Sequence, residues 1–566
     1  MNDDIFPILA HELTRRRLLA RMVIGGGSLV LGSQFLAACS SDETSDSPGA
    51  KKVTVAFSAF ENNLTPFTLT MLALPVTHDL VHLVHDALFW SQAKLKPEPF
   101  LAKSAAPNAE HTEWTVKLRS GVSWHDGKPF TAEDVKFTFD YYRHAPGVSG
   151  RYGHHVFDTP LYDHAEIIDE HTVKLLYSGP APTFTILPGA DLPIVAKHIW
   201  ENVPEPKKFS TELPVGTGPY QLVEMVPDQL YRFKANEKYF KGKPLVDELV
   251  LPIIKDPSAA FAALRAGQVD LVARNVPPEL IKQFEKQSDL TVVSGSRWES
   301  VQLNFNCKKA PLSDPRLRKA FSLGIDVDTI LSQVLLGRGK PGNDNFLHPS
   351  SPWALPDGQH EFDAARAEKM LDDAGYAKPE GGAVRQTDNG EPLEFSLLVS
   401  SFYPQGIRAC QLAAQQVAKI GVKLKVTSLD PASIRQARTA APGKVPEFDI
   451  FLSTLEAHAH ADPDCLYFFF RTPLHTQAGP ASTGYSNPEF DSMSDRAKKE
   501  IDPQARKKLL YTMQRTLAAE TPALVLYYPD GIYAYRQQAY SGWISDAPQG
   551  IFTKRSFLPG YSRKKA

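Results

Sequence analysis

Three histidines, His78, His82 and His85, have the spacing most suggestive of metal chemistry. They fall at i, i+4 and i+7 in THDLVHLVHDALF, which places three imidazoles on one face of a helix. Histidines at i and i+4 are a common zinc-binding pair. The same pattern also fits the outer polar face of an amphipathic helix, and no fourth ligand is evident from the sequence. We therefore assign no metal ligands and expect no cofactor.

A second histidine-rich segment follows the apolar run FDIFLST and contains Glu456, His458 and His460. Glu456 offers a carboxylate that can neutralise an enclosed ammonium group, because a buried charge needs a partner. His458 and His460 can instead recognise an anion, a sugar or a metal chelate. A loop without a binding role would contain the same residues, so these interpretations stay open.

Aromatic residues complete the candidate site. Each ring has a flat apolar face and a polar edge, which suit a partly polar ligand in an enclosed site. The same rings can also belong to a core. The aromatic residues are Trp298, Tyr403 and Tyr527.

Motifs for catalysis and for nucleic-acid binding are absent from the sequence. It contains neither a GxSxG elbow nor an HExxH helix, so we expect no enzyme. The net charge of −2 gives no basic excess for nucleic acid. Besides Cys39, the cysteines are Cys307, Cys410 and Cys465, which allow at most one disulfide among them.

The elements that position these residues alternate between strands and helices. KVTVAFS, EWTVKL and DELVLPIIK have the alternation of strands. Thr131 and Asp134 predict a capped helix start. Asp256, Pro257 and Gly267 mark the cap, first residue and end of another helix. This order predicts an α/β fold with mixed sheets.

The N-terminus has the layout of an export signal. Arg15 and Arg16 lie in TRRRLL, which resembles a twin-arginine signal, and a short apolar run follows. LAAC ends at Cys39 and resembles a lipobox, so we expect residues 1–39 to be a lipoprotein signal peptide ending at the lipidated cysteine. Residues 40–50 are acidic and small, which predicts a flexible tether.

Four stretches together resemble the extracellular solute-binding proteins of family 5, the oligopeptide-, dipeptide- and nickel-binding proteins of ABC importers. The stretches are GVSWHDGKPFTAEDVKFTFDYYR, LPVGTGPYQLVEMVPDQLYRFKANEKYF, AAFAALRAGQVDL and VQLNFNCKKAPLSDPRLRKAFSLGID. The resemblance implies a two-lobed fold of the periplasmic-binding-protein type II class with a central cleft. When the lobes of the family are transferred to this sequence, lobe I spans residues 51–300 and is completed by residues 531–566. Lobe II spans residues 301–530.

In this family, binding of a solute between the lobes shifts the population toward a closed form. The peptide-binding members hold the peptide ammonium with an aspartate that has no clear counterpart before Asp462 and Pro463. Glu456 is the candidate substitute. With the cleft that the resemblance implies, the predicted substrate-binding residues are Trp298, Tyr403, Glu456, His458 and Tyr527.

The resemblance thus implies an extracytoplasmic, lipid-anchored monomer that captures a small polar solute and delivers it to an ABC permease. A short peptide or amine-bearing compound is the first choice of solute, and a metal chelate or an oligosaccharide is the alternative. An exported hydrolase or metal enzyme, or a ligand sensor or chaperone, are alternatives of other classes.

Overall fold

The computed structural model describes most of the chain from residue 51 to residue 561. The described range excludes residues 59, 61–63, 68–74, 92–96, 146–161, 207, 210–212, 297, 439–444, 456–462, 464–468, 473–482 and 546–549. The predictions for Arg15, Arg16, Cys39, the tether, Glu456 and His458 therefore lie outside the described residues. Within the described part, no helix combines the length and apolar character needed to cross a membrane.

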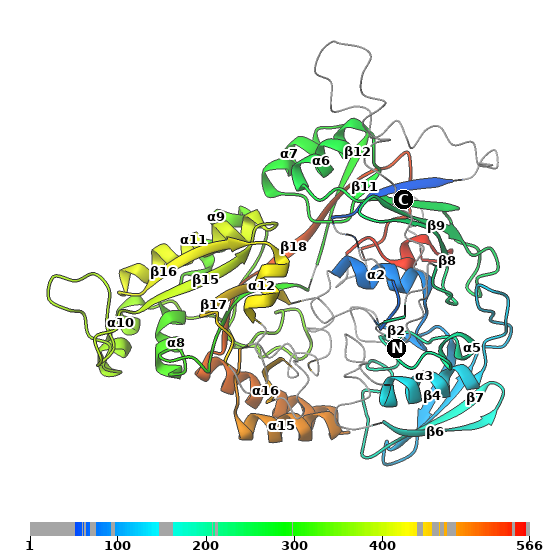
Figure 1. The fold of residues 1–566 in the computed structure, drawn as a ribbon, viewed down its shortest axis with the longest axis horizontal. Helices are drawn as coiled ribbons and strands as arrows, with labels where there is room; N and C mark the ends of the chain where they lie inside the picture. The colour runs from blue at the N-terminus through cyan, green and yellow to red at the C-terminus, as the bar shows by residue number, and fades with distance from the viewer. Residues whose placement is uncertain are drawn as a thin grey trace, which may run out of the picture. The chain divides into compact units, whose positions relative to one another are not determined.

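A twelve-stranded mixed sheet is the main element of the fold (Figure 1). Its path is β16-β15-β17-β13-β18-β11-β1-β10-β9-β8, and β12 and β14 also pair with β18. The strands are β1 (Lys52–Ala56), β8 (Tyr220–Val226), β9 (Leu230–Ala235), β10 (Glu248–Pro252), β11 (Leu271–Val272), β12 (Leu290–Ser296), β13 (Ser300–Phe305), β14 (Gly339–Pro341), β15 (Glu394–Ser400), β16 (Lys423–Leu429), β17 (Ile450–Leu455) and β18 (Ala523–Arg536).

Strand β18 joins two parts of this sheet. Its first half pairs antiparallel with β13, with Tyr527 opposite Val301. Its second half pairs with β12, from Asp530 opposite Ser296 to Arg536 opposite Leu290. One continuous strand therefore contributes hydrogen bonds to both parts of the sheet.

A second sheet, β4-β5-β7-β6, packs against helix α3. Its strands are β4 (Ala102–Pro107), β5 (Glu113–Leu118), β6 (Tyr162–Asp169) and β7 (Thr172–Tyr177), and β2 (Phe89–Ser91) pairs separately with β3 (Pro97–Pro99).

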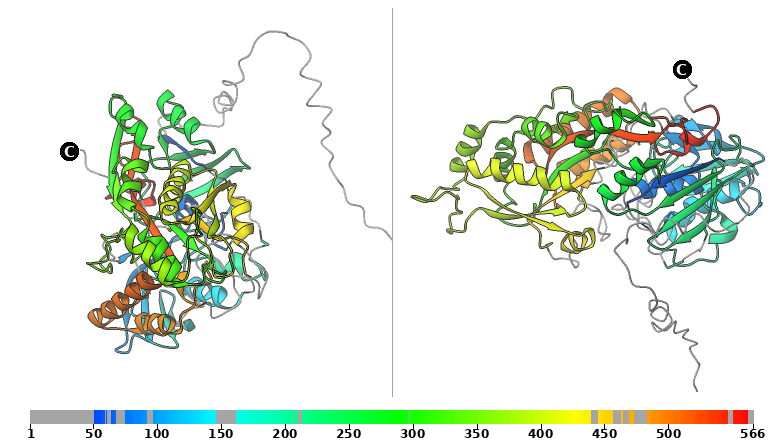
Figure 2. Two further views of the ribbon diagram at one scale, coloured as in Figure 1. Left: turned by 90° about the vertical axis from the view of Figure 1, so that its left-hand side faces the viewer. Right: turned by 90° about the horizontal axis from the view of Figure 1, so that it is seen from above.

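The other elements of the described part are helices, some of which pack against the sheets and some against other helices. Figure 2 shows α11 lying along β15 and β16. The helices are α2 (Pro75–Val84), α3 (Ala132–His144), α5 (Lys197–Trp200), α6 (Pro257–Ala266), α7 (Pro278–Glu285), α8 (Pro315–Leu323), α9 (Val327–Leu335), α10 (Ala364–Asp373), α11 (Pro404–Lys419), α12 (Pro431–Arg438), α15 (Pro488–Lys499) and α16 (Pro503–Glu520), with a 3₁₀ turn η2 (Lys554–Phe557).

The helix-start signals are confirmed. Thr131 and Asp134 form a reciprocal capping box at the start of α3. Asp256 accepts a hydrogen bond from the Ala259 amide at the start of α6, and Gly267 ends that helix with a φ of 79°. These contacts satisfy backbone groups that a helix end leaves unpaired. The predicted mixed α/β fold class is also confirmed.

The hydrophobic clusters divide by sequence position. One large cluster draws its buried residues from between Val301 and Tyr527. Another combines residues from Val53 to Leu271 with residues from Tyr533 to Phe557. The C-terminal segment after β18 is thus packed with the N-terminal part of the chain.

A buried cluster of polar side chains connects the C-terminal segment to the N-terminal part of the chain. The Lys554 ammonium lies 2.6 Å from Asp86 Oδ1, and both side chains are fully buried. Tyr239 donates to Asp86 Oδ1 over 3.0 Å, and Thr217 donates to Asp86 Oδ2 over 3.1 Å. Burial lowers the pKa of Lys554, whereas Asp86 acts against that shift. We call these four residues the Asp86 cluster.

Candidate functional site

Three of the predicted binding residues lie near the point where β13, β17 and β18 meet. Ser300 at the start of β13 pairs with Leu455 at the end of β17. Val301 pairs with Tyr527 in the middle of β18. The chain thus enters β13 from Trp298 beside the end of β17, the strand that precedes the segment containing Glu456 and His458.

Trp298 belongs to an aromatic stack. Its side chain is only 5% exposed. The indole lies parallel to the imidazole of His348, with ring centroids 5.5 Å apart and an interplanar angle of 11°. His348 in turn contacts Tyr528 edge to face at 5.1 Å. Burial, together with the nearby Lys340, lowers the pKa of His348 to about 4, so this imidazole is neutral at neutral pH.

Tyr527 and Tyr403 form a separate pair. Consecutive residues of a strand point to opposite faces of the sheet, so Tyr527 points away from Tyr528 and its stack. Its hydroxyl lies 3.2 Å from that of Tyr403. Tyr527 is fully buried and Tyr403 is partly buried. The predicted aromatic residues are therefore divided between the two faces of β18.

A row of polar side chains runs along one face of β13. Ser300, Gln302 and Asn304 alternate with apolar residues and are all buried. Gln302 Nε2 donates to Asn304 Oδ1 over 2.9 Å, and Asn304 Nδ2 donates to Ser453 Oγ on β17 over 2.8 Å. Amide and hydroxyl groups of this kind can hydrogen-bond a polar ligand as both donors and acceptors.

The sequence did not identify His348 or this polar row as site residues. The alternation of polar and apolar residues in SVQLNFN is the local signal for the row, but the same alternation is typical of any half-buried strand. His348 had no local signal, because its place beside Trp298 depends on the pairing of distant segments.

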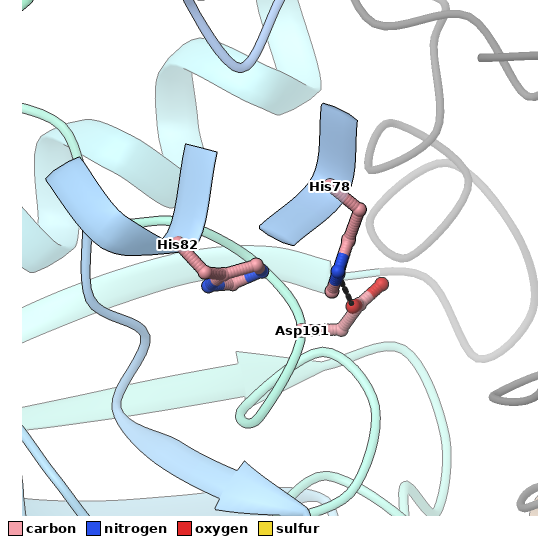
Figure 3. Close-up of side chains that lie close together, drawn as sticks. All are labelled: His78, His82 and Asp191. Atoms are coloured by element: carbon pink, nitrogen blue, oxygen red, sulfur yellow. Dashed lines mark hydrogen bonds and ion pairs between the residues drawn. The ribbon is translucent and has the colours of Figure 1, made fainter. Parts of the chain in front are cut away.

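The three histidines of the first segment do not act as one group. His78 and His82 lie together on α2, with ring centroids 4.3 Å apart. His78 Nε2 lies 3.0 Å from Asp191 Oδ1 (Figure 3). All three histidines are buried, so the interpretation as an exposed polar helix face is wrong. His78, His82 and Asp191 each offer a ligand atom, and these atoms lie within 4.8 Å of one another.

His85 belongs to different surroundings. It follows the end of α2 and is fully buried, which lowers its pKa to about 3, helped by the nearby His125 and Lys554. The positive charge of Lys554 disfavours a metal cation at His85. Lys554, which influences His85 electrostatically, belongs to the Asp86 cluster, and His85 is not part of the group around Asp191.

The family model for bacterial extracellular solute-binding proteins, family 5, matches residues 96–476, well over half of the chain. The chain belongs to this family. Members of the family bind solutes and are not enzymes, so the expectation of a non-enzymatic binding protein is confirmed and the hydrolase alternative is dropped.

Individual relatives extend the similarity over nearly the whole chain. The oligopeptide-binding protein AppA of Bacillus subtilis is 26% identical over 542 residues, covering 91% of this chain and 94% of AppA. The solved structure of AppA in complex with a nonapeptide superposes with a TM-score of 0.79 at 24% identity, covering 91% of this chain and all of that chain.

A third match comes from a protein with a different ligand. NikZ of Campylobacter jejuni, solved in complex with Ni(L-His), superposes with a TM-score of 0.74 at 24% identity, covering 86% of this chain and 94% of that chain. These structures establish the periplasmic-binding-protein fold of the chain.

Proposed function

We propose that the protein captures a short peptide or another amine-bearing polar solute and delivers it to an ABC importer. The observation that carries this proposal is the similarity to AppA along 91% of the chain and 94% of that relative. AppA is an oligopeptide-binding protein. The relationship therefore extends well beyond any single motif.

The side chains near the point where β13, β17 and β18 meet support the proposal of a ligand with both polar and apolar groups. The stack of Trp298, His348 and Tyr528 supplies aromatic rings, and β13, which pairs with the strand of Tyr528, carries the row of amide groups. A peptide needs both, because its backbone consists of donors and acceptors whereas its side chains add apolar area. We propose that the ligand is bound by Trp298, Tyr403, Glu456, His458 and Tyr527.

The proposed mechanism is closure of two lobes. Lobe I comprises residues 51–300 and 531–566, and lobe II comprises 301–530, in keeping with hydrophobic clusters that divide near the same positions. A solute that contacts both lobes favours the closed state by its differential affinity for that state. The permease then distinguishes loaded from empty protein by this conformation.

Export and anchoring complete the proposal. The twin-arginine pattern at Arg15 and Arg16 directs export, and lipidation of Cys39 holds the protein at the membrane. Tethering raises its local concentration at the permease. Cys39→Ser should release the protein from the membrane fraction, whereas Arg15→Lys with Arg16→Lys should stop export.

The first experiment is native mass spectrometry of the protein purified without denaturation. A ladder of peptide masses that disappears on unfolding supports the proposal. A single mass carrying a metal signature, as the NikZ complex with Ni(L-His) suggests, would replace the peptide by a chelate. A sugar mass would favour the oligosaccharide alternative.

A matched pair of variants then tests the site. Trp298 and Trp114 are both 5% exposed, but Trp114 lies in β5. Trp298→Ala should weaken ligand binding about 30-fold, the loss of an aromatic anchor of about 2 kcal/mol. Trp114→Ala should leave the affinity unchanged. Equal affinities in both variants would remove Trp298 from the site.

A further inference from the structure

His78, His82 and Asp191 form a compact buried group of two imidazoles and one carboxylate (Figure 3). The side chains are 6%, 1% and 8% exposed, respectively. We propose that this group, the zinc triad, binds one Zn²⁺ ion with the fourth coordination position left to water or a small ligand. This proposal goes beyond solute capture and does not depend on it.

The distances suit a small tetrahedral ion. Three ligands at about 2.0–2.1 Å from a tetrahedral zinc lie about 3.3 Å from one another. The ligand atoms of the triad already lie within 4.8 Å of one another, and His78 Nε2 and Asp191 Oδ1 are 3.0 Å apart. Binding of the ion would draw the more widely separated ligand atoms closer together.

The backbone around the triad is held on both sides. His78 and His82 lie four residues apart on α2, so consecutive turns of the helix place both rings on one side. Asp191 lies between two backbone hydrogen bonds that connect its segment to the chain after α2. These are Phe89 N to Gly189 O and Ile194 N to Asp86 O, each 2.9 Å. The ligands are therefore pre-positioned, which favours metal binding.

The choice of metal follows from the ligand types. Neutral imidazole and carboxylate are the zinc ligands of three-residue sites with one open position. Magnesium and calcium prefer oxygen ligands throughout, so two imidazoles discriminate against them. Trp90 meets the His82 ring edge to face with centroids 5.6 Å apart, which limits the rotation of that ring.

The ion would connect α2 to the segment around Asp191. A metal that binds the folded form alone stabilises it in proportion to the logarithm of its concentration. Zinc should therefore raise the unfolding temperature of the protein, independently of any solute.

The test is zinc binding to the purified full-length protein after metal removal with EDTA. We expect one Zn²⁺ per chain, and X-ray absorption at the zinc edge should show two imidazoles and oxygen ligands. His78→Gln, His82→Gln and Asp191→Asn should each weaken binding by at least about 100-fold, since even the loss of an outer-shell partner costs 10–100-fold. Asp191→Asn keeps the shape of the side chain and so separates ligand loss from misfolding.

A matched control is His164→Gln. His164 also lies beside carboxylates, 2.8 Å from Asp163 and 3.8 Å from Glu166, but it is exposed. This variant should bind zinc as the wild type does. The proposal is overturned if the triad variants, folded by circular dichroism, retain wild-type zinc affinity, or if the wild type binds no zinc at micromolar concentrations. Peptide masses in native spectra of zinc-free protein would leave the proposed function standing in either case.

Discussion

Two buried carboxylates near helix α2, Asp86 and Asp191, have different partners. Beyond the C-terminal end, Asp86 faces an ammonium, a phenol and a hydroxyl, all from the protein. Along α2 itself, Asp191 faces the imidazole of His78 near the start of the helix, with His82 of the last turn beside it. The first cluster contains its own cation, whereas the second has the ligand types that bind one from solution.

This difference assigns different roles to similar residues. A buried carboxylate paired with lysine makes a permanent connection whose strength depends on the sequence alone. A carboxylate grouped with imidazoles makes a connection whose strength depends on metal concentration. The Asp86 cluster should therefore determine the basal stability of this region, and the zinc triad should adjust it.

The largest expected effect comes from removing the internal cation. Lys554→Met leaves the Asp86 carboxylate buried without its ammonium and should lower the free energy of unfolding by about 3–5 kcal/mol, measured by urea denaturation. Lys554→Met combined with Asp86→Asn should regain much of this loss, because no buried charge remains uncompensated. A loss below about 1 kcal/mol in the single variant would show that this pair does not govern stability.

The second-largest expected effect is the stabilisation of the folded protein by zinc. Zinc at about 100 times its dissociation constant should stabilise the wild type by about 2.7 kcal/mol. Lys554→Met should gain the same increment, whereas His82→Gln, which binds zinc at least about 100-fold more weakly, should gain at most about 0.4 kcal/mol. Denaturation curves with zinc and with EDTA measure both increments. If zinc stabilised Lys554→Met but not the wild type, the ion would bind at the Asp86 cluster. The zinc triad would then not be the place where an external cation binds.

The smallest effect concerns His85, which lies between the two clusters in sequence. Its folded-state pKa of about 3 lies below the ordinary value of 6.5. Between these pH values the unfolded chain binds a proton that the folded protein does not, so stability falls as the pH drops from 6.5 toward 3.

His85→Gln should reduce this pH dependence by up to about 1.4 kcal/mol per pH unit. The measurement is the free energy of unfolding of the wild type and of His85→Gln in EDTA, at intervals from pH 7 to pH 4.5. His164→Gln provides the exposed control. An unchanged slope for His85→Gln would show that His85 accepts a proton without unfolding.

Much of the fold could be predicted from the sequence because its signals are local. Asp256, Pro257 and Gly267 act within one helix, and the alternation in KVTVA reflects the two faces of one strand. Such signals depend on residues a few positions apart, so tertiary structure need not be known. The match of four stretches to one family supplied the topology that these signals lack.

The site could be predicted only in part because its contacts are distant in sequence. Asp191 is 113 residues from His78, and Lys554 is 468 residues from Asp86. No spacing rule connects such pairs, since the topology of the sheet brings them together. The histidine pattern on α2 was visible, but an exposed face and a buried ligand pair have the same spacing. Only the burial of α2 distinguishes them.

Strand β18 also determines the order in which the molecule can be completed. It lies between β13 and β11 in the sheet, yet its residues, Ala523–Arg536, come near the end of the chain. While the ribosome is still making the protein, the edges of β13 and β11 lack this partner and can pair with other chains. Because the middle of the sheet is synthesised last, a chain that terminates prematurely before residue 523 lacks the strand that joins its two parts.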